Sequence, residues 1–343
     1  MAGQYAKPRS SPTETLPNGE VIQSFRGENI NGISPADRTP DPARLVSSYF
    51  HAAATLNYTR ALLSSGFASL HGPEKWLLGH VKKESTRREY QSIVDSVTES
   101  LNFVKVVGAD NPSIFENVDL FTSHEALILD YESALTKYYP GDQEGWYDTS
   151  AHFLWVGERT RQLDHAHIEF IRGIENPIGI KVGPGMGNDE LISLLNLVNP
   201  TKAPGRVTLI TRYGCAKITA VLAGHIKAVR DSGHIPVWCS DPMHGNTRTS
   251  PSNPKLKTRY FDDILSELDS AFTIHQQNGG RLNGLHFELT GEVGVTECVG
   301  GSMEVSDQGL EANFRSFCDP RLNFEQSMDM AFLVAKRLRS IKI

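Results

Sequence analysis

Short apolar runs alternate with helical patterns along this chain of 343 residues. Each run is bounded by polar, glycine or proline residues, as is typical of buried strands. The predicted strands cover residues 2–6, 118–121, 152–156, 178–182, 207–211, 235–239 and 284–289. Apolar positions three and four residues apart predict helices. These cover residues 41–64, 85–107, 126–137, 189–198, 217–231, 260–277 and 324–338. Residues 11–40, rich in Pro, Gly, Ser and Asn, and residues 139–149 are predicted to be loops.

Residues 151–184 are the clearest unit of this alternation and predict strand, loop, helix and strand. The helix ends before Pro177, because the residue before a proline is disfavoured in helical geometry. The second strand, 178–182, places Lys181 among apolar residues, where a charge is costly unless it meets a partner. A strand–helix–strand unit requires a parallel sheet, and parallel sheets carry their chemistry at the strand ends.

Polar residues follow almost every predicted strand. This arrangement favours a closed barrel over an open sheet, because a barrel gathers all its strand ends at one mouth. We therefore predict an α/β fold of the TIM (β/α)8 type. It forms a single domain over residues 1–343, with a helical insertion at about 41–110.

Composition narrows the class of protein. The net charge of 34 − 40 = −6 gives no reason to expect a nucleic-acid partner. No apolar run reaches the roughly 18 residues of a membrane span, and the first ten residues lack the apolar stretch of a signal peptide. The four cysteines, Cys215, Cys239, Cys298 and Cys318, are scattered without a CxxC pair. We expect no disulfide framework, small buried residues at Cys215, Cys239 and Cys298, and a reducing, cytoplasmic location.

Five basic residues lie at or just after predicted strand ends. They are Lys7, Arg9, Arg159, Lys181 and Arg212. In a barrel they converge on one mouth, which predicts a site for an anionic substrate, a phosphate or a carboxylate. The alternative is that each one pairs with an acid of a neighbouring loop.

One histidine and two carboxylates form a second candidate set. His244 follows one strand, Glu288 lies at the end of the next, and Asp319 lies in the loop after the last strand. Imidazole and carboxylate groups are ordinary ligands for a divalent cation such as Mn²⁺. By spacing alone, hydrogen-bonded loop residues remain an alternative. We expect that structural role for the further histidines His71, His80, His165, His225 and His275.

Several long stretches are distinctive. They are AGQYAKPRS at 2–10, SFRGENING at 24–32, LNYTRALL at 56–63, TSHEALILDYESALT at 122–136, the segment 152–184, TLITRYG at 208–214, VWCSDPMHGNT at 237–247, GLHFELTGE at 284–292, TECVGG at 296–301 and CDPRLN at 318–323. In this order, over nearly the whole chain, they resemble the class II 3-deoxy-D-arabino-heptulosonate 7-phosphate (DAHP) synthase family. This family is the plant and microbial type of the first shikimate-pathway enzyme.

The resemblance implies a TIM-barrel enzyme that condenses phosphoenolpyruvate with D-erythrose 4-phosphate to DAHP and releases phosphate. This is the first step of the shikimate pathway to the aromatic amino acids. Arg159, Lys181 and Arg212 match the phosphoenolpyruvate-binding residues of the family. Trp155 and Glu158 line the same pocket, and we expect Lys181, Glu158 and Trp155 to serve catalysis.

The same resemblance extends to the second substrate and the metal. Three residues match the erythrose 4-phosphate contact, namely Lys7, Arg9 and Ser10. Three match ligands of a divalent cation, namely His244, Glu288 and Asp319. The cation, Mn²⁺ or another such as Co²⁺, would act as a Lewis acid on the aldehyde.

Family members carry a metal-binding cysteine and a further phosphoenolpyruvate-binding arginine ahead of the stretch AGQYAKPRS. Neither lies in these 343 residues, so we expect the first βα unit of the barrel to be absent from this chain. Three hypotheses follow. The first is a synthase whose upstream part is lost from the record or supplied by another polypeptide. The second is a truncated, non-catalytic phosphate-binding homologue or partner of a full-length synthase. The third is a barrel aldolase or lyase acting on a related phosphosugar.

We favour the first hypothesis, because the matching site residues within the chain are all intact. The resemblance also implies a homo-oligomer, as in the intact family. The expected location is the cytoplasm, or a plastid if the source is a plant.

Overall fold

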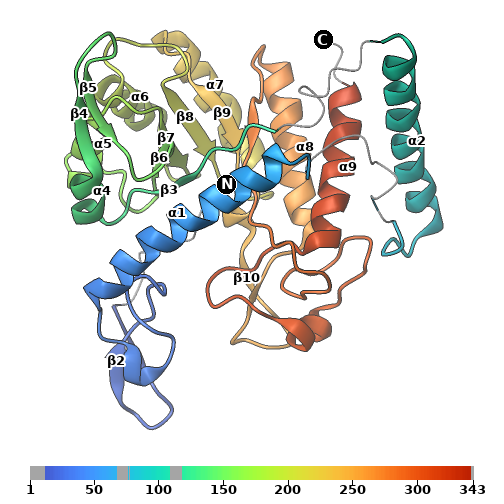
Figure 1. The fold of residues 1–343 in the computed structure, drawn as a ribbon, viewed down its shortest axis with the longest axis horizontal. Helices are drawn as coiled ribbons and strands as arrows, with labels where there is room; N and C mark the ends of the chain where they lie inside the picture. The colour runs from blue at the N-terminus through green and yellow to red at the C-terminus, as the bar shows by residue number, and fades with distance from the viewer. Residues whose placement is uncertain (1–11, 68–75, 77, 109–117, 341–343) are drawn as a thin grey trace. The chain divides into compact units, whose positions relative to one another are not determined.

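A computed structural model describes residues 12–67, 76, 78–108 and 118–340 (Figure 1). The predicted strand at 2–6 lies outside these residues, as do Lys7, Arg9 and Ser10. The chain divides into two units. The first contains the described parts of 1–54, 120–245 and 266–286, and the second those of 55–119, 246–265 and 287–343. The organisation as a single domain with a helical insertion stays a prediction.

Six strands of the first unit form one parallel sheet (Figure 1). Their order across the sheet, β3, β6, β7, β8, β9 and β12, is also their order along the chain. They cover Ser123–Glu125, Phe153–Val156, Ile178–Val182, Val207–Thr211, Val237–Ser240 and Gly284–Leu285. Neighbouring parallel strands joined by helices are an α/β arrangement of the kind found in barrels, so the predicted α/β class is confirmed.

The helices follow the predicted pattern closely. Those that connect the strands of the sheet are α4 (Leu129–Leu135), α5 (Ala166–Arg172), α6 (Asn188–Val198), α7 (Ile218–Ser232) and α8 (Phe261–Gln277). The others are α1 (Pro42–Ser64), α2 (Glu84–Val106) and α9 (Phe324–Ser340). Short 3₁₀ helices cover Pro35–Asp37, His244–Asn246 and Asp307–Asn313, and a small hairpin pairs β10 (Arg248–Thr249) with β11 (Lys257–Thr258).

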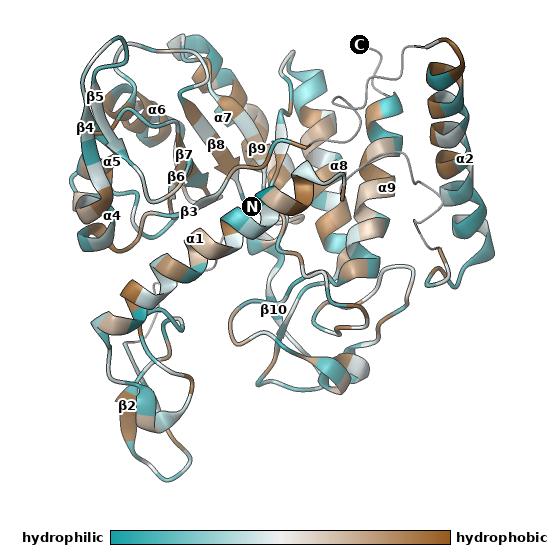
Figure 2. Ribbon diagram, in the orientation of Figure 1, coloured by the Kyte–Doolittle hydropathy of each residue, from teal (hydrophilic) through white to brown (hydrophobic). Residues whose placement is uncertain are grey.

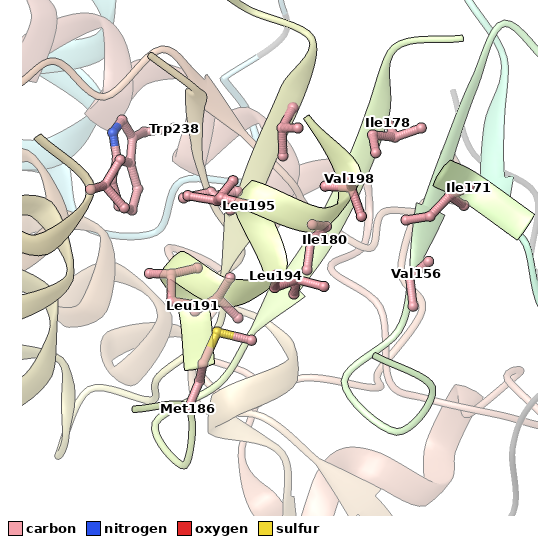
Figure 3. Close-up of a cluster of buried hydrophobic side chains, with 14 of the residues drawn as sticks. Val156, Ile171, Ile178, Ile180, Met186, Leu191, Leu194, Leu195, Val198 and Trp238 are labelled. Carbon is pink, nitrogen blue, oxygen red and sulfur yellow. The ribbon is translucent and has the colours of Figure 1, made fainter. Parts of the chain in front are cut away.

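The apolar core of the first unit lies between the sheet and its helices (Figure 3). All residues of β7 are buried, as expected of a parallel strand covered on both faces. Leu191 and Leu194 of α6 are fully buried in this core. Gly179 has no room for a side chain, because an added Cβ would lie 2.8 Å from Phe153 Cζ and 2.9 Å from Trp155 Cβ. The close packing of β6 on β7 therefore holds Trp155 beside the strand that carries Lys181.

A second, smaller core lies in the second unit. Tyr90 of α2 stacks on Phe332 of α9 with ring centroids 4.5 Å apart, and Val81 and Val94 are buried with them. In Figure 2 apolar and polar residues alternate around α2, as in an amphipathic helix. The spacing of its apolar residues was therefore a sound guide to the face that is buried.

The loop predicted over 11–40 is wrong in part, because it contains a short hairpin. Thr13–Thr15 (β1) pairs antiparallel with Val21–Gln23 (β2), and Gly19 in the turn has a φ of 85°. Glycine adopts this left-handed geometry without a Cβ clash, and Asn-Gly is a common hairpin turn. Strands of three residues are too short for an alternating pattern to be recognised.

The boundaries of two predicted strands are also wrong. The strand expected at 118–121 lies further along the chain, as β3. Its pairing with β6 begins only at Ser123, and Phe121 is 62% exposed. The strand expected at 284–289 is only the two-residue β12, which pairs with the end of β9. Apolar character alone thus misplaced strands whose limits are set by the neighbouring strand.

The helix predicted at 126–137 and the loop predicted at 139–149 need correction as well. The helix α4 ends at Leu135, and the chain continues as an antiparallel hairpin. Its strands are β4 (Thr136–Tyr139) and β5 (Gly145–Asp148). Tyr138 lies opposite Trp146 with ring centroids 5.5 Å apart. Cross-strand aromatic pairs stabilise hairpins, and this pairing overrides the local helical pattern.

A buried polar cluster joins β3, α4 and β5. His124 Nε2 lies 2.7 Å from Glu132 Oε1, and Ser150 Oγ donates to Glu132 Oε2 at 2.6 Å. Asp148 Oδ1 accepts from the Ser150 N–H, whereas its buried Oδ2 has no hydrogen-bond partner among the described residues. Burial, followed by the charge of Glu132, raises the pKa of Asp148 to about 7. Folding therefore favours the protonated carboxyl at this position.

We predict that Asp148→Asn removes a pH dependence of stability. The pKa of Asp148 is higher in the folded state than in the unfolded state. Its contribution to the stability of the wild type is therefore fully present below the unfolded pKa of 3.8, and it is lost as the pH rises through the folded pKa of about 7. At pH 8 the variant should be more stable than the wild type by roughly 1–2 kcal/mol, less than the full shift implies because solvent screens part of it. Urea unfolding from pH 4 to 8 measures this difference. Asp231→Asn, a change at an exposed ion pair with Lys227, is the control and should leave the profile over this range unchanged. Equal pH dependence of wild type and Asp148→Asn would contradict the account.

Candidate active site

Charged and aromatic residues gather where the strands of the first unit end. Trp155 lies in β6, Lys181 in β7, Arg212 directly after β8 and Asp241 directly after β9. Because adjacent parallel strands run in one direction, their carboxyl ends share one edge of the sheet. The first unit therefore has a charged edge of the kind that binds ligands in α/β proteins.

Lys181 has the partner that its position in an apolar strand requires. It is 5% exposed, and its Nζ forms an ion pair with Asp241 Oδ2. The same Nζ lies 5.6 Å from the centroid of the Trp155 ring, within the range of a cation–π contact. The ammonium group is thus held between a carboxylate and an aromatic face.

Asp241 is 0% exposed and has four hydrogen-bonding contacts. Oδ1 accepts from the backbone N–H groups of Met243 and His244, each at 3.1 Å. Oδ2 accepts from Lys181 Nζ and lies 2.7 Å from His244 Nδ1. Burial alone would raise the pKa of Asp241, but the charges of His244 and Lys181 outweigh it and hold the pKa well below its ordinary value. The residue is therefore an anion that organises its neighbours.

Arg212 has an N–H group without an acceptor in the described structure. Its Nη2 donates to the His244 carbonyl at 3.0 Å, while its Nε is buried without a hydrogen-bond partner in the described structure. A guanidinium stays protonated, so a buried N–H of this kind is costly unless an acceptor arrives. An anionic ligand would supply that acceptor.

The loop after β8 is fixed by backbone contacts. Glu267 Oε1 accepts from the N–H groups of Tyr213 and Gly214 at 2.9 and 3.0 Å. Gly245 approaches the same loop so closely that an added Cβ would lie 2.3 Å from Gly214 N. This contact permits no side chain at position 245 and holds His244 next to the loop of Arg212.

Glu158 lies in the loop after β6, and both of its carboxylate oxygens accept hydrogen bonds. Its Oε2 accepts from the Gly183 N–H at 2.7 Å, and its Oε1 accepts from Arg161 Nη2 at 2.9 Å. Arg159 is exposed, and its carbonyl accepts from Gln162. The ion pair with Glu158 is formed by Arg161, a residue that the sequence prediction did not include.

Groups that can ligate a cation occur in both units. In the first, Asp241, His244 and His286 offer ligand atoms within 4.8 Å of one another. The His286 ring also packs edge-on against Trp155, with centroids 5.4 Å apart. The predicted ligands Glu288 and Asp319 belong to the second unit.

Arg259 holds the two carboxylate positions of the second unit in place. It is 0% exposed and forms an ion pair with Glu288, while its Nη1 also donates to the carbonyl of Pro320, next to Asp319. Its Nε donates to Thr247 Oγ1 at 3.0 Å. Asp319 itself lies 3.8 Å from Lys257 Nζ. The sequence places Arg259 at a helix entry and offers no sign of this role.

The cysteines and most histidines behave as structural residues. All four cysteines are free thiols, and burial raises the pKa of Cys239 and of Cys298 to about 12, so neither is a thiolate. His225 bonds to the Tyr213 hydroxyl at 2.7 Å and to the Met186 carbonyl at 2.9 Å. It lies on α7 rather than in a loop.

His275 departs from the predicted role of a satisfied loop residue. It lies on α8, and neither ring nitrogen has a hydrogen-bond partner in the described structure. Burial lowers its pKa to about 4, and its ring packs on Trp238 at 5.2 Å. It is a neutral aromatic residue of the core. His71 lies outside the described residues.

Fold and site together define an α/β enzyme that places a lysine, an arginine and a carboxylate–histidine pair at the ends of parallel strands. The chain belongs to the class-II DAHP synthetase family, whose model matches residues 1–335. The resemblance carried by the sequence motifs is therefore confirmed.

Curated relatives agree with this assignment. A phospho-2-dehydro-3-deoxyheptonate aldolase of Neurospora crassa is 49% identical over 354 residues, covering 99% of this chain and 73% of the relative. Proteins of the same name from Streptomyces coelicolor and Mycolicibacterium smegmatis are 45% and 43% identical. Each alignment covers 99% of this chain, and 74% and 73% of the respective relative. In the part of the chain that is described, no helix is long and apolar enough to cross a membrane.

We predict that Arg259→Gln destabilises the protein by about 3 kcal/mol, because it removes the fully buried ion-pair partner of Glu288, whose own side chain is mostly buried. Urea unfolding in the presence of chelator measures this loss without a contribution from metal. Lys257→Gln is the matched control. Its amine is exposed and 3.8 Å from Asp319, so we expect a change within about 0.5 kcal/mol. Equal losses for the two variants would contradict the role given to Arg259.

Proposed function

We propose that this chain condenses phosphoenolpyruvate with D-erythrose 4-phosphate to DAHP and phosphate, the first step of the shikimate pathway. The observation that carries the proposal is the charged edge itself: Lys181, held by Asp241, lies against Trp155, and Arg212 keeps a buried N–H without an acceptor. Relatives named as phospho-2-dehydro-3-deoxyheptonate aldolases support a synthase over a non-catalytic homologue.

Phosphoenolpyruvate would bind through Arg159, Lys181 and Arg212. Its phosphate and carboxylate need several cationic donors, and the unpartnered Arg212 Nε is suited to one of their oxygens. Trp155 and Glu158 would line the pocket. Erythrose 4-phosphate would bind through three residues outside the described part of the chain, namely Lys7, Arg9 and Ser10.

His244, Glu288 and Asp319 would hold a divalent cation, Mn²⁺ by preference and Co²⁺ as an alternative. The donor set fits, because imidazole nitrogen and carboxylate oxygen suit such ions. Asp241 contacts Nδ1 of His244, so Nε2 is the nitrogen that would face the cation. When bound, this ion supplies Lewis-acid polarisation of the aldehyde oxygen.

The residues of the chain then serve the remaining steps. The enol carbon of phosphoenolpyruvate forms a bond to the aldehyde carbon, water adds at the carbon that bears the phosphate ester, and the C–O bond to phosphate breaks. Arg212 and Arg159 hold the anionic groups of the substrate. Lys181, hydrogen-bonded to Asp241, is positioned to hold a proton beside the reacting carbons and to return it.

The finer description of the fold also belongs to this proposal. We propose that the sheet is part of a TIM (β/α)8-type barrel in a single domain with a helical insertion at about 41–110. The order of its six parallel strands supports this. A homo-oligomer and a cytoplasmic location remain part of the same proposal.

We predict that Arg212→Ala weakens binding of phosphoenolpyruvate by roughly 2–4 kcal/mol and binding of erythrose 4-phosphate much less. The physical reason is the loss of a charge-assisted contact at a partly buried position. KM values for both substrates, with direct binding of phosphoenolpyruvate by calorimetry, measure the difference. Arg172→Ala, which removes an exposed arginine paired with Glu169, is the control and should leave both constants unchanged. Equal weakening for both substrates, or none, would count against the pocket.

A further inference from the structure

Asp241 is connected to two residues that the proposed function assigns to different tasks. One oxygen contacts both Lys181 of β7 and the imidazole of His244, while the other accepts two backbone N–H groups. The contact with Lys181 joins residues 60 positions apart in sequence. The backbone N–H of Asp241 in turn donates to the Thr211 carbonyl at 2.7 Å, which ties the residue to the end of β8.

These contacts require a proton on Nδ1 of His244. Lys181 Nζ and the two backbone N–H groups can only donate, so the carboxylate acts as an acceptor toward each of them. His244 Nδ1, at 2.7 Å from the same carboxylate, must then be a donor as well. A neutral imidazole with its hydrogen on Nδ1 presents a lone pair at Nε2, which is the form that binds a metal.

We propose that Asp241 is a positioning residue that holds His244 as the Nδ1–H tautomer and Lys181 at the phosphoenolpyruvate side. A single carboxylate thereby fixes both the tautomer of the metal ligand His244 and the position of the substrate-binding Lys181. This inference rests on the proposed function for the identity of the metal and the substrate. The tautomer itself can be observed without either.

The substitution Asp241→Asn separates this role from a merely structural one. An amide has the shape of the carboxylate but only one acceptor oxygen. The two backbone N–H groups hold that oxygen on their side, so the amide nitrogen faces Lys181 and His244. Lys181 then loses its acceptor, and the amide N–H favours a His244 that accepts at Nδ1 and carries its hydrogen on Nε2.

Three readouts test the proposal on the full chain. Nitrogen NMR of histidine-labelled protein without metal, with His244→Gln to assign the signal, should show Nδ1–H in the wild type and Nε2–H in Asp241→Asn. The free-ion EPR signal of Mn²⁺ should report an affinity 10- to 100-fold weaker in Asp241→Asn. In turnover, kcat should remain reduced when Mn²⁺ saturates, because Lys181 has lost its partner.

Asp148→Asn is the matched control, since it changes a buried carboxylate of the same unit that contacts neither Lys181 nor His244 in the described structure. It should keep the wild-type tautomer, Mn²⁺ affinity and kcat. A wild-type His244 without a proton on Nδ1 would overturn the proposal, and this measurement needs no variant to fold. Wild-type Mn²⁺ affinity in a folded Asp241→Asn would overturn it too, as would a kcat fully restored by Mn²⁺.

Failure of the proposed function has a different signature. In that case the wild type binds no Mn²⁺ or forms no DAHP, yet its His244 still carries the hydrogen on Nδ1. The tautomer therefore tests the role of Asp241 toward His244 even when the reaction is wrongly assigned.

Discussion

The buried ion pair between Lys181 and Asp241 is the interaction on which the rest of the site depends. Removing two charges from water is expensive, and their attraction compensates only where further hydrogen bonds complete the arrangement. Here the carboxylate gains two backbone N–H groups and the imidazole of His244, and the ammonium gains the face of Trp155. Such a pair contributes little to stability compared with apolar packing, so its place at the strand ends is best explained by chemistry.

The fold allows this arrangement only because two glycines let neighbouring segments approach closely. Gly179 lets β6 and β7 approach closely enough to bring Trp155 against the lysine strand, and Gly245 lets the loop after β9 meet the loop after β8. In the second unit, Arg259 holds two positions in place, because it contacts Glu288 and the carbonyl of Pro320, next to Asp319. Buried charged residues thus fix the positions of the groups proposed to bind metal, each within its own unit.

Much of this could be predicted from the sequence, and the exceptions have physical reasons. The strand–helix–strand pattern of residues 151–184 predicted a parallel sheet, and the lysine inside its second strand indicated a buried partner. The identity of the partner could not be predicted, because Asp241 lies 60 positions away in sequence and resembles any other polar residue that follows a strand. Arg259 contacts Glu288 at a separation of 29 residues and gives no local signal. The hairpin β4–β5 was missed because its aromatic pairs form only across strands, while the residues before it continue a helical pattern.

The central claim is that these residues join the enol carbon of phosphoenolpyruvate to an aldehyde and release phosphate by breaking a C–O bond. Its most direct test is to incubate the purified chain with Mn²⁺ and phosphoenolpyruvate in ¹⁸O-labelled water, with and without erythrose 4-phosphate. Mass spectra of the phosphate and of the sugar product then locate the label. The account predicts phosphate release only when the aldehyde is present, unlabelled phosphate, and ¹⁸O at the new keto carbon. Release without the aldehyde, or ¹⁸O in the phosphate, would contradict it.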